Sequence, residues 1–187
     1  IIANKPQPPK WFVSHWWGQP VIEFIESLEG HARDRGLGLD TSYWIRAFAN
    51  NQWNADEEIG ENANESSFYR AMKLSEGTVS ILDRKAVCYT RIWFNYECYL
   101  SFVEFGKDRS ISDNGESPHL YDAYTICQNE EGKTIVVGLT DGPVALDNDG
   151  VRSQANRQHS FPLEIVNNAL RVKINNAEAS KPQDKTY

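Results

Sequence analysis

An alternation of short apolar runs with segments of helical periodicity is the feature that most constrains the fold of this chain. Trp11–His15 is a short apolar run, and Val21, Phe24, Ile25 and Leu28 follow it. Their i, i+3, i+4 and i+7 spacing is typical of one face of a helix. A strand that leads into a helix, repeated along a chain, predicts a parallel sheet with helices on its faces.

The same alternation continues to about residue 105. We expect a second strand, a short helix capped by Ser66 or Ser67, a β-branched third strand and a strongly apolar helix. These elements fall at residues 43–49, 66–74, 78–83 and 90–105.

The C-terminal part has a different pattern. Two strand candidates over residues 121–127 and 134–139 are joined by a short link, which predicts an antiparallel hairpin on the sheet. A turn over residues 147–150 and a last helix over residues 161–179 follow. The expected fold class is therefore α/β, with a mostly parallel sheet.

The two ends of the chain are expected to be connecting segments. Residues 1–10 hold three prolines and predict an extended lead-in, and residues 180–187 form a polar tail. The chain begins at Ile1 rather than Met. We expect one domain over residues 11–179 taken from a longer protein, with the tail linking it to a missing region.

Charge and cysteine usage exclude several classes of protein. The net charge of -7 argues against a nucleic-acid partner, which requires a basic surface. Cys88, Cys98 and Cys127 lack the spacing of a disulfide framework or a zinc site and favour a reducing, cytoplasmic location. No apolar run approaches the roughly 20 residues of a membrane span.

No metal site or resident cofactor is expected. Asp147-Asn148-Asp149-Gly150 is similar to the start of a calcium loop, but Asn156 stands where the bidentate Glu is needed. Neither GxGxxG nor GxxxxGK[ST] occurs, which argues against dinucleotide-dependent oxidoreductases and P-loop ATPases.

Polar and tryptophan side chains lie at the ends of the first three predicted strands or directly after them. Ligands of parallel sheets bind outside the carboxyl ends of the strands, so these residues are expected to share one edge. They are Ser14, His15, Trp16, Trp17, Asn50, Asn51, Gln52, Asp83 and Arg84.

Trp93 and Glu97 are four residues apart and are expected to lie on one face of the helix that follows the third strand. A carboxylate beside an indole is partly desolvated, which raises its pKa. The alternative is a surface glutamate with Trp93 in the core.

The other candidates have structural alternatives as well. His15 can bond a neighbouring turn, the two tryptophans Trp16 and Trp17 can wedge the first helix against the sheet, and residues 50–52 can satisfy loop backbone. A Ser14–His15 nucleophile pair is disfavoured, because adjacent strand residues face opposite ways.

Two of these segments resemble motifs of the TIR domain family. Phe12-Val13-Ser14-His15 is similar to the opening strand of the family, and Trp93-Phe94-Asn95-Tyr96-Glu97 is similar to its W-C-x-x-E motif. The likeness covers residues 11–105. Phe94 stands in place of the motif Cys, and residues 50–52 with the acidic loop 54–65 replace the R-D-x-x-P-G loop.

The resemblance implies a flavodoxin-like three-layer sandwich and two possible functions. Some members cleave the nicotinamide–ribose bond of NAD with the motif glutamate, here Glu97, so NAD is the expected substrate. Other members only assemble signalling complexes. A non-catalytic protein-interaction or nucleotide-sensing module, with self-association, is therefore the alternative.

In the enzyme hypothesis Glu97 stabilises the positive charge that develops on the ribose. This requires a pocket shared by Glu97, residues 14–17 and residues 50–52. The candidate stacking side chains are Trp16, Trp17 and Trp93, and the candidate pyrophosphate contacts are His15, Arg84 and Arg91.

Overall fold

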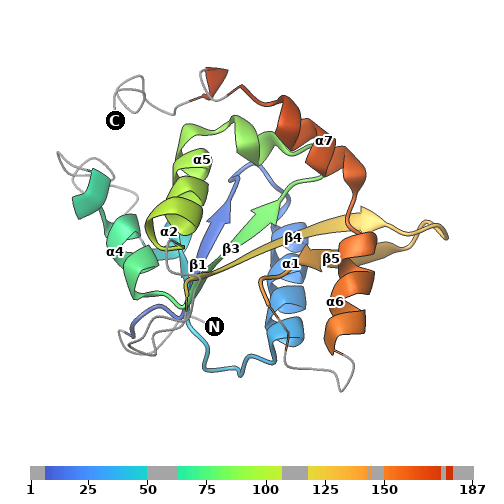
Figure 1. Cartoon of the computed structure of the whole chain (residues 1–187), viewed down its shortest axis with the longest axis horizontal. Coiled ribbons are helices and arrows are strands. Elements are labelled where there is room, and N and C mark those ends of the chain that lie inside the picture. Colours follow the sequence, from blue (N-terminus) through green and yellow to red (C-terminus); the bar gives the residue numbers. More distant parts are fainter. Residues whose placement is uncertain are drawn as a thin grey trace.

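A five-stranded sheet in the order β2-β1-β3-β4-β5 forms the centre of the computed structural model (Figure 1). The structure describes residues 7–49, 63–106, 118–142, 144, 150–173 and 176–178. The first four strands run parallel, and β5 pairs antiparallel with β4. The strands are β1 (Trp11–His15), β2 (Tyr43–Ile45), β3 (Gly77–Leu82), β4 (Leu120–Gln128) and β5 (Thr134–Leu139).

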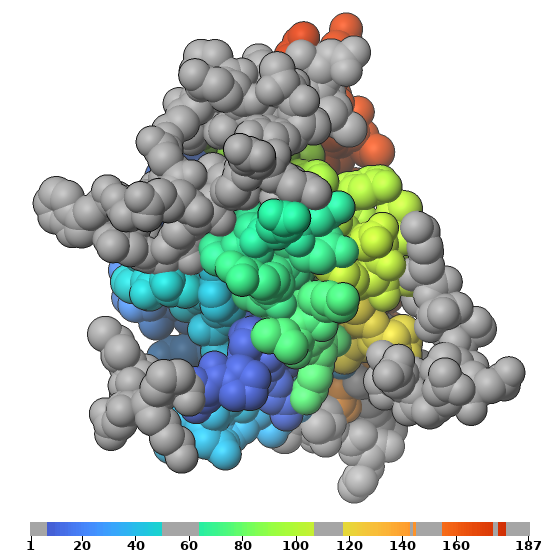
Figure 2. Space-filling model, turned by 90° about the vertical axis from the view of Figure 1, so that its left-hand side faces the viewer, coloured from blue at the N-terminus to red at the C-terminus, as the bar shows by residue number. Residues whose placement is uncertain are grey.

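Helices cover both faces of this sheet, which confirms the predicted α/β three-layer class. In Figure 1, α4 and α5 lie to the left of the strands, and α1 and α6 lie to the right. Figure 2 shows α4 and α5 side by side on the surface of that left-hand layer. The α-helices are α1 (Val21–Arg35), α2 (Arg46–Ala49), α4 (Ser67–Leu74), α5 (Ile92–Tyr99), α6 (Gly150–His159) and α7 (Leu163–Arg171).

Shorter helical segments complete the description. The 3-10 turn η1 spans Ala63–Glu65, and the 3-10 turn η2 spans Val87–Thr90 just before α5. A π-helical segment, η3 (Leu100–Glu104), continues α5. Among the described residues no helix combines the length and the apolarity that a membrane crossing requires.

Successive side chains of β1 point to opposite faces of the sheet and enter the hydrophobic core on each side. Trp11 and Val13 pack with Phe24 of α1, whereas Phe12 packs with Phe68 of α4. Ser14 belongs to the same face as Phe12, because side chains two residues apart in a strand point the same way. Ser14 therefore faces the layer of α4 and α5.

The buried face of α1 differs from the expected one. The helical spacing predicts Val21 and Ile25 in the core, but they are 70% and 44% exposed. The buried positions are Phe24, Ser27, Gly30 and His31. A Cβ at Gly30 would lie only 2.5 Å from the Val136 side chain, so the helix turns its small residue toward β5.

The second strand and the last helix are also corrected. β2 ends at Ile45, and the expected continuation to Ala49 is the one-turn helix α2. The sequence pattern predicts a last helix over 161–179, but the helix spans Leu163–Arg171 with Pro162 at its N-cap. A further helix over Gly150–His159, which the pattern does not predict, precedes it.

The remaining elements follow the sequence pattern. Ser66 caps α4, because its hydroxyl accepts a hydrogen bond from the Tyr69 backbone N–H at 3.3 Å. The hairpin of β4 and β5 is present in antiparallel register. Residues 1–6, 50–62, 145–149 and 179–187 lie outside the described residues, and they include most of the acidic loop, the predicted turn and the polar tail.

Candidate functional site

Glu97 on α5 and Ser14 on β1 meet at the carboxyl end of the parallel sheet. The Ser14 hydroxyl donates a hydrogen bond to the Glu97 carboxylate, although the two residues are 83 positions apart in the chain. Both side chains are buried, with 7% of Glu97 and 1% of Ser14 exposed. This contact joins the two segments that carry the TIR resemblance.

The electrostatic environment of Glu97 favours its protonated form. Burial raises the pKa of this carboxyl to about 7, although the Ser14 bond and the positive charge of Arg46 oppose the rise. The cause is desolvation, since a carboxylate loses its hydration when it is buried. A carboxyl group whose pKa is shifted this far by burial is more frequent at functional sites than elsewhere.

The strand order explains why this edge is a favourable place for a ligand. β1 and β3 are neighbours, but after β1 the chain continues to β2 at one edge of the sheet, whereas after β3 it continues to β4 in the opposite direction. Such a switch point opens a crevice at the carboxyl ends of the two strands. Ser14 and Glu97 lie at this end of β1.

Arg46 is a site residue that the sequence did not predict. It is the first residue after β2, and its guanidinium lies 5.6 Å from the centre of the Trp93 ring. Trp93 also packs edge-on against Phe68 of α4 at 5.3 Å. Trp93 therefore connects α4 and α5 and holds the cation whose charge acts on Glu97.

His15 points away from this group. Its ring lies 4.6 Å from the ring of Phe24 on α1, on the opposite face from Ser14. Burial lowers the pKa of His15 to about 4, so the imidazole is uncharged at neutral pH. In this state it adds no positive charge for a pyrophosphate.

The two tryptophans after β1 have different environments. Trp16 is half-buried and packs over Gly18, where an added Cβ would lie 2.2 Å from the indole ring. Trp17 is 59% exposed. Of the two, Trp17 is the side chain that presents its ring to solvent.

The two predicted arginines are paired with carboxylates. Arg84 forms a salt bridge of 2.9 Å with Glu23 of α1. Arg91 contacts Glu178 at 3.2 Å, and the backbones of these two residues form a parallel bridge. Asn50, Asn51 and Gln52 lie outside the described residues, so the structure places eight of the eleven predicted site residues.

Asp83, the residue after β3, stabilises the turn at the carboxyl end of this strand. Its carboxylate accepts hydrogen bonds from the backbone N–H groups of Lys85 and Cys88, both at 3.0 Å. These bonds hold the turn that leads into η2 and α5.

A second buried polar cluster lies on the α1 face. His31 Nε2 is 3.1 Å from Asp122, and His31 Nδ1 is 2.8 Å from the Tyr43 hydroxyl. Arg35 contacts the same carboxylate through two nitrogens at 2.7 and 2.5 Å. Burial alone would raise the pKa of Asp122, but the bonds from His31 and Arg35 hold it below its usual range. Because His31 and Asp122 are fully buried, this cluster binds α1 to the sheet.

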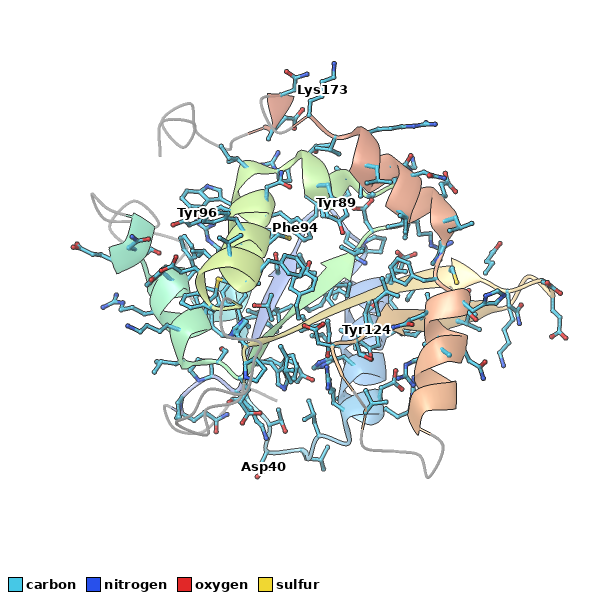
Figure 3. All side chains as sticks on the ribbon, viewed as in Figure 1. Asp40, Tyr89, Phe94, Tyr96, Tyr124 and Lys173 are labelled. Atoms are coloured by element: carbon cyan, nitrogen blue, oxygen red, sulfur yellow. The ribbon has the colours of Figure 1, made fainter. Side chains whose placement is uncertain are left out.

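The structure outlines a cavity of about 400 Å³ elsewhere, over β4 and beside α7. Its walls include Tyr89, Phe102, Tyr121 and Phe161, and none of the eight predicted site residues that the structure describes lines it. Figure 3 shows Tyr89 and Phe94 close together beside α5. Glu97 and Ser14 do not line this cavity, so it is not the pocket that the enzyme hypothesis requires.

Among the described residues no three His, Cys, Asp or Glu side chains gather in a way that could hold a metal ion. Comparison of the chain with protein-family models, with curated proteins and with solved structures finds no match.

Proposed function

We propose that this chain is a TIR-like domain that cleaves the nicotinamide–ribose bond of NAD, with Glu97 as the key carboxylate. The observation that carries the proposal is the hydrogen bond between Ser14 and Glu97. The two residues come from the two motifs of the resemblance. Their meeting at the switch point of a β2-β1-β3-β4-β5 sheet supports a shared role.

The reaction needs little more than a fixed negative charge. When the nicotinamide–ribose bond breaks, its electron pair leaves with the nicotinamide nitrogen and the ribose becomes oxocarbenium-like. Water then adds to the ribose and releases a proton, which gives ADP-ribose. A carboxylate in a site of low dielectric stabilises such a cation more strongly than one in water.

The environment of Glu97 predicts the pH dependence of this reaction. Stabilising a cation requires the ionised carboxylate, and burial raises the pKa of Glu97 to about 7. The rate is therefore expected to rise as the pH increases through about 7.

The test is release of nicotinamide from NAD by the purified chain, at high protein concentration and under conditions that favour self-association. Wild type is expected to turn over, and Glu97→Gln is expected to lose at least 100-fold in rate, on the order of what removing one transition-state contact costs. Glu29→Gln, a change at an exposed carboxylate of α1, is the matched control. No release by wild type, or equal release by both variants, would refute the proposal.

A non-catalytic interaction or nucleotide-sensing module is the second candidate. Trp17 is 59% exposed and Ile22 at the start of α1 is 62% exposed, which supports a protein contact because Trp is frequent at interface hot spots. Sedimentation at increasing concentration would then show self-association that Trp17→Ser weakens. Calorimetry that detects NAD binding without turnover would favour the sensing function.

A further inference from the structure

The cavity over β4 has a floor of sheet residues and walls from helical segments that lie over the same face of the sheet. Leu82, Tyr121 and Ala123 form part of the floor, because alternate residues of β4 face this side. Phe102 of η3 stands on one side, and Ala169 of α7 stands on the other. The methyl group of Ala123 fills little of the space between them.

The mouth of the cavity exposes apolar side chains to water. Phe102 is 47% exposed, Val166 is 38% exposed and Leu170 is 79% exposed. Exposed apolar side chains in the lining of a cavity are characteristic of a binding site, because a ligand removes their surface from water.

Among the described residues that line the cavity there is no lysine, arginine or histidine. The one carboxylate, that of Asp141, accepts a hydrogen bond from the Tyr121 backbone N–H at 2.8 Å. Burial raises the pKa of Tyr89 and of Tyr121, so both phenols stay neutral at physiological pH. The described lining thus holds no cation that would pair with a phosphate or a carboxylate. Its other polar groups, such as those of Thr140 and Gln158, are neutral, so the lining suits an uncharged molecule.

Aromatic rings dominate the walls. Phe102 and Tyr121 lie 4.3 Å apart between ring centres, in a tilted arrangement. Phe102 belongs to the π-helical segment Leu100–Glu104, and such segments occur frequently at functional sites. Rings of this kind pack best against another ring, edge-on or offset.

We propose that this cavity binds an uncharged aromatic small molecule, at a site separate from Glu97. Its volume of about 400 Å³ is within the usual range for small-molecule sites, about 300–1,000 Å³. The proposal does not depend on NAD cleavage, since none of its lining residues belongs to the Glu97 site.

The position of Tyr121 links the two sites. Its hydroxyl donates a hydrogen bond to Ser80 of β3 at 2.8 Å and lies 3.4 Å from the sulfur of Cys98. Cys98 directly follows Glu97 on α5. A ligand that contacts Tyr121 is thus one hydrogen bond away from the helix that carries the candidate catalytic residue.

The test uses N-phenylnaphthylamine, an uncharged aromatic probe that fluoresces in apolar surroundings. Wild type is expected to bind it saturably at one site per chain. Ala169→Trp, which fills the half-buried wall position, is expected to weaken binding at least tenfold. Leu163→Trp adds the same side chain to an exposed position of α7 outside the cavity, and it is expected to bind like wild type.

Circular dichroism checks that each variant is folded. If Ala169→Trp does not fold, Val166→Asp places a charge at the exposed mouth and is expected to weaken probe binding at least tenfold as well. Binding without saturation, or equal binding by wild type and the cavity variants, would overturn the proposal. Concentration-dependent dimerisation that the cavity variants abolish, with no probe binding, would also overturn it, because the groove would then receive a second copy of the chain.

Discussion

Replacing Glu97 by Gln is expected to stabilise the fold in a pH-dependent way. The pKa of this carboxyl is raised from 4.5 to about 7 in the folded chain. At pH values below 4.5 the group is protonated in both the folded and the unfolded chain. Between 4.5 and about 7 the unfolded chain releases the proton while the folded chain keeps it, so the free energy of unfolding of wild type falls as the pH rises.

The size of this effect follows from the two pKa values. The free energy of unfolding falls by about 1.4 kcal/mol for each pH unit in this range. When the pH increases from 4.5 to about 7, wild type therefore loses about 3 kcal/mol of stability. The full loss is reached once the folded carboxyl is ionised. The Glu97→Gln variant lacks this loss, because a glutamine side chain has no proton to release in this range. Its amide oxygen can still accept the hydrogen bond from Ser14.

Urea unfolding followed by tryptophan fluorescence, repeated at intervals across this pH range, measures the effect. Subtracting the wild-type curve from that of Glu97→Gln cancels contributions from other groups such as His15. The difference is expected to grow by about 3 kcal/mol between the two pKa values. For the exposed control Glu29→Gln it is expected to stay within about 0.5 kcal/mol. If the difference in free energy of unfolding between Glu97→Gln and wild type stays constant, or shrinks as the pH rises, Glu97 does not have the raised pKa of a buried carboxyl.

Three further substitutions test individual contacts that stabilise the fold. Asp122→Asn leaves the buried Arg35 guanidinium without its carboxylate and is expected to lower the free energy of unfolding by about 3–5 kcal/mol near neutral pH, by urea denaturation. The loss relative to wild type shrinks in acid, because wild-type Asp122 is then protonated as well. Gly30→Ala places a Cβ against Val136 and is expected to cost about 1–3 kcal/mol despite the better helix propensity of Ala; a gain in melting temperature would contradict this. Ser66→Ala removes the cap of α4 and is expected to cost about 1 kcal/mol, with Ser66→Asp retaining most of the stability in the same thermal assay.

Much of the fold could be predicted from the chain because its signals are local. The apolar run Trp11–His15 and the β-branched third strand lead to β1 and β3 at the expected places. The short polar link over residues 128–133 predicts the antiparallel pairing of β4 and β5. Ser66 marks the start of α4 by the same kind of local bond.

The candidate site was only partly predictable. Ser14 was selected by its place at the end of the first strand, and Glu97 by its spacing from Trp93 and by the family resemblance. Strand alternation separated Ser14 from His15. The sequence did not reveal Arg46, because an apolar run that continues to Ala49 gives no signal that β2 ends at Ile45. The neighbouring strand β1 continues to His15, two residues beyond Val13, the partner of Ile45. β2 therefore ends where the backbone turns into α2, and this turn is a property of the folded chain.

The sequence by itself determined the period, order and caps of the main elements, because hydrophobic spacing and turn chemistry act over a few residues. Only the tertiary structure decided that Glu97 is buried against Ser14, that α1 turns Gly30 and His31 toward the sheet, and that an apolar cavity opens above Ala123. Burial, pKa and cavity shape come from contacts between residues far apart in the chain. Those contacts depend on how whole layers pack, and no local pattern of residues encodes them.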